Sequence, residues 1–105
     1  MEITFLLEML TKEKLLDELK RLKPELEKKY KVKSIGLFGS YLKDNISEKN
    51  DIDILVEFYK GADLFDYIGL NLFLKEIFHK NVDLVSKTAL RDKLRKYILK
   101  DVVYL

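Results

Sequence analysis

A chain of 105 residues is the size of one ordinary domain, and its 48% hydrophobic and 36% charged residues indicate a packed core under a charged surface. The absence of cysteine excludes disulfide frameworks, thiol catalysis and Cys-based zinc sites, and a single histidine, His79, excludes a multi-histidine metal site. The 20 Lys and Arg against 18 Asp and Glu give a net charge of +2, which argues against a dedicated nucleic-acid binder because such binding needs a concentrated positive surface.

The N-terminal sequence indicates a cytoplasmic location. It begins Met1-Glu2-Ile3, with no basic region before its short apolar stretch, so it does not resemble a signal peptide. No apolar run approaches the ~20 residues that are needed to span a bilayer. We therefore expect a soluble cytoplasmic protein without a membrane partner, folded as a single domain over residues 1–105.

The first element in chain order is predicted to be an amphipathic helix over residues 12–30, with Thr11 as its N-cap. Its apolar residues recur at intervals of three and four: Leu15, Leu19, Leu22, Leu26 and Tyr30. Pro24 lacks an amide donor and clashes with the preceding turn of a helix. We therefore expect the helix to break near Lys23 and to restart with Pro24 in its first turn.

Three strands are predicted in the remainder of the chain. The first covers residues 32–38 and ends at a Gly-Ser turn, after which the polar residues 41–49 are expected to form a short helix or turn and a loop. The second covers residues 51–58, and its Ile-Leu-Val centre indicates burial on both faces. The third is a short strand over residues 81–86.

Two further helices complete the predicted order. One covers residues 63–78 and ends at His79, and the other is a basic C-terminal helix that Thr88 caps and that extends to about Lys100. The order of helices and strands predicts an α/β (α+β) fold with a small mixed β-sheet flanked by helices. The pattern alone does not determine how the strands pair.

The turn at Gly39 and Ser40 is a candidate phosphate-binding site. A glycine at the end of a strand lets the backbone approach a ligand closely, and a serine hydroxyl and free amides can hold a phosphate. The alternative is an ordinary turn, since Gly-Ser is a common turn sequence.

Asp51 and Asp53 form a second candidate site at the start of the second strand. Residues two apart in a strand project from the same face, so the two carboxylates should lie side by side. Such paired oxygen ligands suit Mg²⁺ or Mn²⁺ together with phosphate oxygens and water. The alternative is a pair of solvated acids at an exposed end of a strand.

Asp83 is a third candidate because it lies within the apolar run Val-Asp-Leu-Val of the last strand, where a charge needs a partner or a metal. If this strand neighbours the strand of Asp51 and Asp53, three carboxylates converge at one edge of the sheet. Three carboxylates beside a phosphate-binding turn are the layout of a two-metal nucleotidyl-transfer site.

The sequence Leu-Phe-Gly-Ser-Tyr at residues 37–41, followed by Asp-Ile-Asp-Ile-Leu-Val at residues 51–56, resembles the signature of the DNA polymerase β-type nucleotidyltransferases. In its length the chain is similar to the minimal nucleotidyltransferases (MNT), which are paired with HEPN-domain partners in prokaryotic toxin–antitoxin modules. The resemblance covers nearly the whole chain and implies the nucleotidyltransferase fold.

By matching position, the resemblance implies a role for each candidate residue. Gly39 and Ser40 would bind the β- and γ-phosphates of the nucleotide, Asp51 and Asp53 would ligate Mg²⁺, and Asp83 would complete the metal site and help to deprotonate the nucleophile.

The loop after the Gly-Ser turn departs from the family pattern. The family often has Ala-Arg-Gly after the tyrosine, whereas this chain has Leu42-Lys43-Asp44. Lys43 would supply the positive charge for the phosphates, but without the bidentate geometry of arginine.

The resemblance implies a Mg²⁺-dependent nucleotidyltransferase that moves AMP from ATP to a hydroxyl. The acceptor would be a tyrosine of a HEPN toxin partner, and the chain would be the antitoxin of a type VII-like toxin–antitoxin module. Two alternatives stay open. One is a non-catalytic antitoxin that binds and occludes its HEPN partner, and the other is a nucleotidyltransferase that acts on RNA or a small molecule.

The helix over residues 63–78 carries ten apolar residues in sixteen, and they are distributed around its whole circumference. One apolar face can cover the sheet, and the surplus predicts a surface for a partner or for self-association. The alternative is that other parts of the same monomer bury it.

Overall fold

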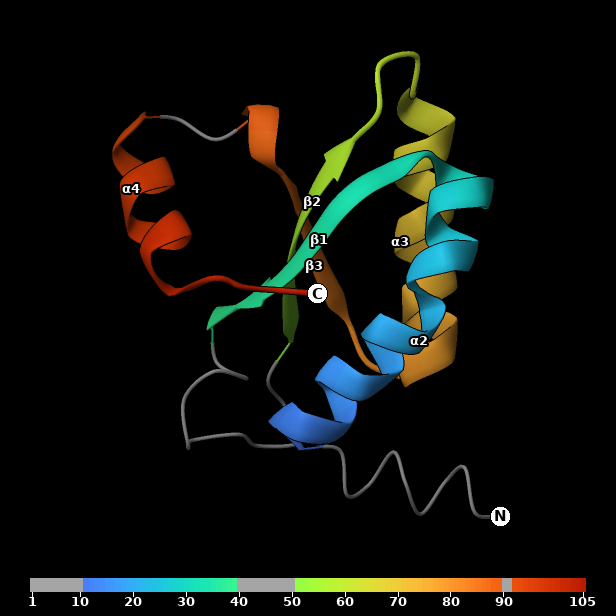
Figure 1. Ribbon diagram of the computed structural model, residues 1–105, viewed down its shortest axis with the longest axis horizontal. Coiled ribbons are helices and arrows are strands. Elements are labelled where there is room, and N and C mark those ends of the chain that lie inside the picture. The colour runs from blue at the N-terminus through green and yellow to red at the C-terminus, as the bar shows by residue number, and fades with distance from the viewer. Residues whose placement is uncertain (1–10, 40–50, 90–91) are drawn as a thin grey trace.

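The computed structural model describes residues 11–39, 51–89 and 92–105, and the predicted turn at 41–49 lies outside them. Figure 1 shows three layers: two long helices cover one face of a central sheet, and a third helix, α4 (Asp92–Asp101), lies on the other side. The predicted α/β class, with a small mixed sheet flanked by helices, is confirmed. None of the described helices is both long enough and apolar enough to cross a membrane.

Helix α2 (Lys12–Tyr30) has the predicted bounds and N-cap, since Thr11 Oγ1 accepts a hydrogen bond from the Lys14 amide at 3.3 Å. The predicted break near Lys23 is wrong, because the helix continues through Pro24. Pro24 is exposed, so the helical hydrogen bond that it removes lies on the solvent side. Leucines before and after it stay buried and hold both halves against the sheet: Leu15, Leu19, Leu22 and Leu26.

The sheet has four strands in the order β3-β2-β1-β4. They are β1 (Val32–Phe38), β2 (Ile52–Phe58), β3 (Val82–Ser86) and β4 (Val103–Tyr104). β1 runs antiparallel to β2 and β4, whereas β2 and β3 are parallel. Parallel neighbours need a long crossover connection, and helix α3 (Leu64–Phe78) provides it. β2 and β3 each begin one residue later than predicted, where their ladder starts with Ile52 opposite Val82.

The C-terminal region differs from the prediction at Thr88, which does not cap the last helix. It lies in a short 3-10 helix, η2 (Lys87–Ala89), and its Oγ1 is 3.0 Å from Ser86 Oγ. α4 begins only at Asp92. The hydroxyl of Thr88 is therefore directed back to the end of β3 and not toward the first turn of α4.

The last residues of the chain form the fourth strand, which was not predicted. β4 pairs with β1, and the Leu105 amide donates to the Ile35 carbonyl at 3.0 Å. Lys23 Nζ donates to the Leu105 carbonyl at 2.6 Å. The ending of the chain is thus attached both to the sheet and to α2.

The hydrophobic core lies between the sheet and helices α2 and α3. Along β2, Ile52, Ile54 and Val56 are fully buried in this core, and strand alternation directs Asp53 and Leu55 to the other face. Leu55 is nevertheless only 1% exposed, because the C-terminal residues lie on that side. The predicted burial of β2 on both faces is therefore confirmed at its centre.

Helix α3 buries one face and exposes another. Asp63 is its N-cap, and Leu70, Leu74 and Phe78 are buried. His79 caps its end, as predicted, and has a left-handed backbone conformation. Four large apolar residues on α3 stay exposed, and we call them the α3 outer stripe: Leu64, Phe65, Ile68 and Leu72. The predicted surplus of apolar surface is confirmed, since Phe65 is 83% exposed.

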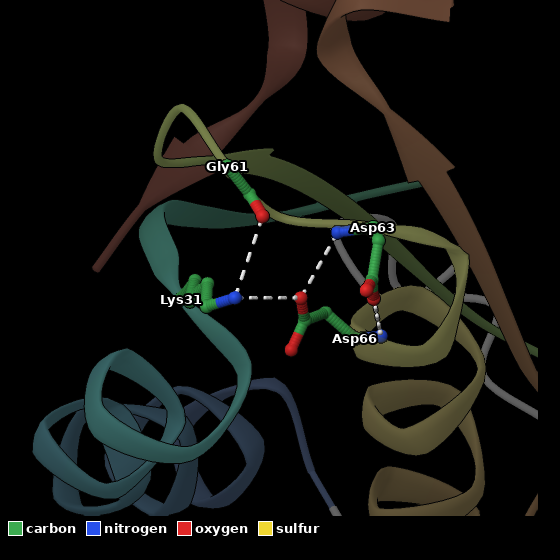
Figure 2. A network of polar contacts seen from close by, with 4 residues as sticks. All are labelled: Lys31, Gly61, Asp63 and Asp66. Carbon is green, nitrogen blue, oxygen red and sulfur yellow. Dashed lines mark hydrogen bonds and ion pairs between the residues drawn. The ribbon is translucent and has the colours of Figure 1, made fainter.

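A polar network joins the end of α2 to the start of α3 (Figure 2). Lys31, the C-cap of α2, donates from Nζ to the Gly61 carbonyl at 3.3 Å and lies 3.5 Å from Asp66 Oδ2. Asp66 Oδ2 also accepts the Asp63 amide at 2.9 Å, and Asp63 Oδ1 accepts the Asp66 amide at 3.1 Å. The network closes the turn between β2 and α3.

The Asp63 amide, followed by Lys31, lowers the pKa of the Asp66 carboxyl below its usual value. A carboxyl whose pKa is lower in the folded state stabilises the fold above its unfolded pKa, and this contribution is lost as the pH falls through the folded value. We expect Asp66→Asn to be less stable than the wild type at neutral pH, with a difference that shrinks between pH of about 5 and about 2. Urea unfolding across this range measures it, with the exposed Glu76→Gln as control. A difference that is independent of pH would contradict this role.

Candidate active site

The parallel pairing of β2 and β3 places Asp53 directly opposite Asp83. Asp51 comes two residues before Asp53, just ahead of β2, and is exposed. Asp53 is partly buried, and Asp83 is exposed. The sequence analysis required the strands of Asp53 and Asp83 to be neighbours if their carboxylates were to lie at one edge of the sheet. The structure shows that these strands are neighbours.

β1 contributes the third part of this edge. Because β1 is antiparallel to β2, its last residue, Phe38, pairs with Asp53, and Gly39 follows directly. The end of β1 thus meets the starts of β2 and β3. We call this region, made of Gly39, Asp51, Asp53 and Asp83, the carboxylate edge.

Gly39 lies against the carboxylate of Asp53. Its φ of +77° belongs to the left-handed region that favours glycine, and a Cβ at this position would collide with Asp53 Oδ2. Both the backbone conformation and the space therefore require glycine here. The other two predicted phosphate contacts, Ser40 and Lys43, lie outside the described residues.

The carboxylate edge offers oxygen ligands for a divalent cation. Like charges directly opposite one another in a sheet are unfavourable, and Mg²⁺ or Mn²⁺ accepts carboxylate oxygens together with water and phosphate oxygens. Across residues 11–39, 51–89 and 92–105, no group of three or more His, Cys, Asp or Glu side chains is arranged to hold a metal ion. The facing pair of Asp53 and Asp83 would supply two carboxylate ligands to such a cation.

Two polar residues of α3 that the sequence analysis did not single out reach the strand of Asp83. The Tyr67 hydroxyl donates to the Leu84 carbonyl, and Asn71 Nδ2 donates to the Val82 carbonyl at 3.3 Å. Their spacing of four residues places them on the same side of a helix. That spacing was visible in the sequence, but the apolar character of the helix gave no sign of a polar contact to β3.

Comparison with known proteins identifies the family of the chain. A family model described as a nucleotidyltransferase domain matches residues 19–105. A relative from Methanocaldococcus jannaschii with a protein adenylyltransferase name is 44% identical over 89 residues, covering 84% of this chain and 91% of the relative. The protein adenylyltransferase MntA of Thermococcus cleftensis is 38% identical over 96 residues, which is 91% of this chain and 97% of MntA.

Solved structures of similar fold point to the same group of proteins. A minimal nucleotidyltransferase superimposes with a TM-score of 0.78 at 28% identity, covering 91% of this chain and 97% of the other. The complex of a tri-AMPylated Shewanella oneidensis HEPN toxin with its MNT antitoxin contains a chain that matches with a TM-score of 0.60 at 27% identity, covering 86% of this chain and 69% of that chain. The chain described here belongs to the nucleotidyltransferase domain family.

Proposed function

We propose that this protein is a Mg²⁺-dependent protein adenylyltransferase of the cytoplasm, which transfers AMP from ATP to a tyrosine hydroxyl of a HEPN-domain toxin and acts as its antitoxin. The observation that carries the proposal is the pairing of Asp53 with Asp83 beside Gly39 in a member of the nucleotidyltransferase family. Two comparisons support the choice of acceptor. Relatives of the chain are named protein adenylyltransferases, and a chain of similar fold was solved in complex with an AMPylated HEPN toxin.

Each predicted site residue has a role in this proposal. Asp51 and Asp53 would hold the metal ion together with Asp83, and the bound ion would neutralise charge on the triphosphate. Gly39 would bring its backbone to the phosphates. Beyond the described residues, Ser40 and Lys43 would complete the phosphate contacts.

The transfer is a displacement at phosphorus. The acceptor hydroxyl oxygen attacks the α-phosphorus of ATP and forms a new oxygen–phosphorus bond. The bond from the α-phosphorus to the oxygen that bridges to the β-phosphate breaks, and pyrophosphate leaves. The hydroxyl proton passes to the carboxylate of Asp83, which is exposed and can release it to water.

Intact-mass spectrometry of the HEPN partner tests the proposal. The partner is incubated with this protein, ATP and Mg²⁺, and we expect its mass to increase by one or more AMP units. A partner that forms a stable complex but gains no mass would favour occlusion without catalysis. A partner that neither binds nor gains mass would direct the search to RNA or a small-molecule acceptor.

The α3 outer stripe is the proposed binding surface for the HEPN partner. Its four exposed apolar residues lie along one helix, and contiguous apolar surface of this kind commonly marks a protein–protein interaction site. α3 packs on the core face of the sheet, whereas strand alternation directs Asp53 to the other face. A partner held on the stripe would therefore not cover the carboxylate edge.

Placing a charge on the stripe should weaken the complex. Aromatic anchors commonly contribute 2 kcal/mol or more to an interface, so we expect Phe65→Asp to raise the Kd for the HEPN partner about 30-fold. Isothermal titration calorimetry measures the Kd, and Lys20→Asp, an exposed position on α2, is the control. An unchanged Kd for Phe65→Asp would place the partner on another surface.

A further inference from the structure

β3 is an edge strand, and its position depends on few backbone contacts. It pairs only with β2 along the described sheet. The Asn81 carbonyl accepts the Ile52 amide at 2.9 Å and so points toward β2. Carbonyls alternate in direction along a strand, so those of Val82 and Leu84 point away from β2, toward the open edge.

Side chains of α3 bind both of these outward carbonyls. Asn71 Nδ2 donates to Val82 and the Tyr67 hydroxyl donates to Leu84, which are the two neighbours of Asp83 in the sequence. The Tyr67 ring also packs against Phe58, with the ring centroids 6.4 Å apart. The backbone of Asp83 is therefore held on the β2 side by the ladder and on the outer side by α3.

We infer that Tyr67 and Asn71 are positioning residues, which fix β3 so that Asp83 stays opposite Asp53 at the distance that a bound divalent cation requires. The inference rests on the proposed function of the carboxylate edge. A binding site of this kind works only when its ligands are held to about 0.5 Å. Asp83 lies on a five-residue strand, and no other strand of the described sheet pairs with the outer side of that strand. Both residues would act through the backbone of β3.

Binding of Mn²⁺ alone, measured by the electron paramagnetic resonance signal of the free ion, tests the inference without any assay of activity. Tyr67→Phe removes one hydroxyl and keeps the ring, and Asn71→Leu removes the amide donor at similar volume. We expect each to weaken Mn²⁺ binding about tenfold, which is typical when a group that orients a metal ligand is removed. Asn71→Gln keeps an amide donor and should retain more affinity than Asn71→Leu.

Two control variants separate positioning from a general loss of stability. Tyr59→Phe makes the same chemical change at an exposed tyrosine, whose hydroxyl donates to Glu27 at 3.3 Å. Phe73→Leu loosens the packing of α3 against Tyr30, where the ring centroids are 5.6 Å apart, and keeps both hydrogen bonds to β3. We expect both to bind Mn²⁺ like the wild type, although Phe73→Leu should unfold at a lower temperature.

The outcomes distinguish this inference from the proposed function. If Asp53→Asn does not weaken Mn²⁺ binding, the carboxylate edge is not a metal site and the positioning role is overturned with it. If Asp53→Asn weakens binding but folded Tyr67→Phe and Asn71→Leu bind like the wild type, only the positioning role is overturned. The positioning role is likewise overturned if Phe73→Leu weakens Mn²⁺ binding as strongly as Tyr67→Phe does. Should Asn71→Leu fail to fold, Tyr67→Phe decides alone.

Discussion

Asp53→Asn should reduce the rate of AMP transfer at least about 10³-fold and leave the fold intact. The substitution keeps the size of the side chain but removes the charge that faces Asp83 in the sheet. Stabilisation of transferring phosphates at such a site contributes several kcal/mol, and each 1.4 kcal/mol corresponds to a factor of ten in rate. The initial rate of AMP incorporation into the HEPN partner measures the effect.

The control for this variant is Asp17→Asn, which makes the same change at an exposed position of α2 and should keep the wild-type rate. Asp53→Asn should still bind the HEPN partner, because the α3 outer stripe is unchanged. If it binds the partner and still protects cells from the toxin, neutralisation does not depend on catalysis. A wild-type transfer rate in Asp53→Asn would show that the carboxylate edge is not the active site.

Gly39→Ala should lower the rate of AMP transfer about 100-fold. The new Cβ must move either the end of β1 or the carboxylate of Asp53, and a displacement of about 1 Å at a reacting site can cost a factor of that size. The left-handed backbone should also lower the free energy of unfolding by about 1–2 kcal/mol. Initial rates and urea unfolding measure the two effects separately.

Gly61→Ala is the matched control, because Gly61 also has a positive φ, of +99°, but a Cβ there meets no atom within 4 Å. It lies in the turn before α3, at the other end of β2 from the carboxylate edge. We expect a similar loss of stability in both variants and a loss of rate in Gly39→Ala alone. Equal rates in the two variants would mean that Gly39 serves only the turn.

The local signals in the sequence predicted most of the fold. These signals depend only on residues that are close together in the chain. They are the apolar spacing in α2, the apolar centre of β2 and the capping residues Thr11 and His79. The continuity of α2 through Pro24 was not predictable in this way, because tertiary packing of buried leucines on both sides outweighs the missing hydrogen bond. β4 has two residues, which is too short for any periodic pattern.

The candidate site was only partly predictable for the same reason. The spacing of Asp51 and Asp53 predicts that they lie near each other, and glycine at position 39 is consistent with a turn. The pairing of Asp53 with Asp83 depends on which strands are neighbours in the sheet. The alternation of side chains along a single strand contains no information about its neighbours. The hydrogen bonds from Tyr67 and Asn71 depend in addition on how α3 crosses the sheet.

The hydrogen bonds from α3 to β3 have a further consequence for how molecules meet in solution. An exposed edge strand can template an intermolecular β-sheet, because its unpaired amides and carbonyls accept a strand from another chain. On β3 the outward carbonyls of Val82 and Leu84 are already bound to Asn71 and Tyr67. An incoming strand would have to displace both side chains, so these two hydrogen bonds protect the edge against aggregation. β3 itself has the sequence Val-Asp-Leu-Val-Ser, without the proline or the several charges that protect many other edge strands.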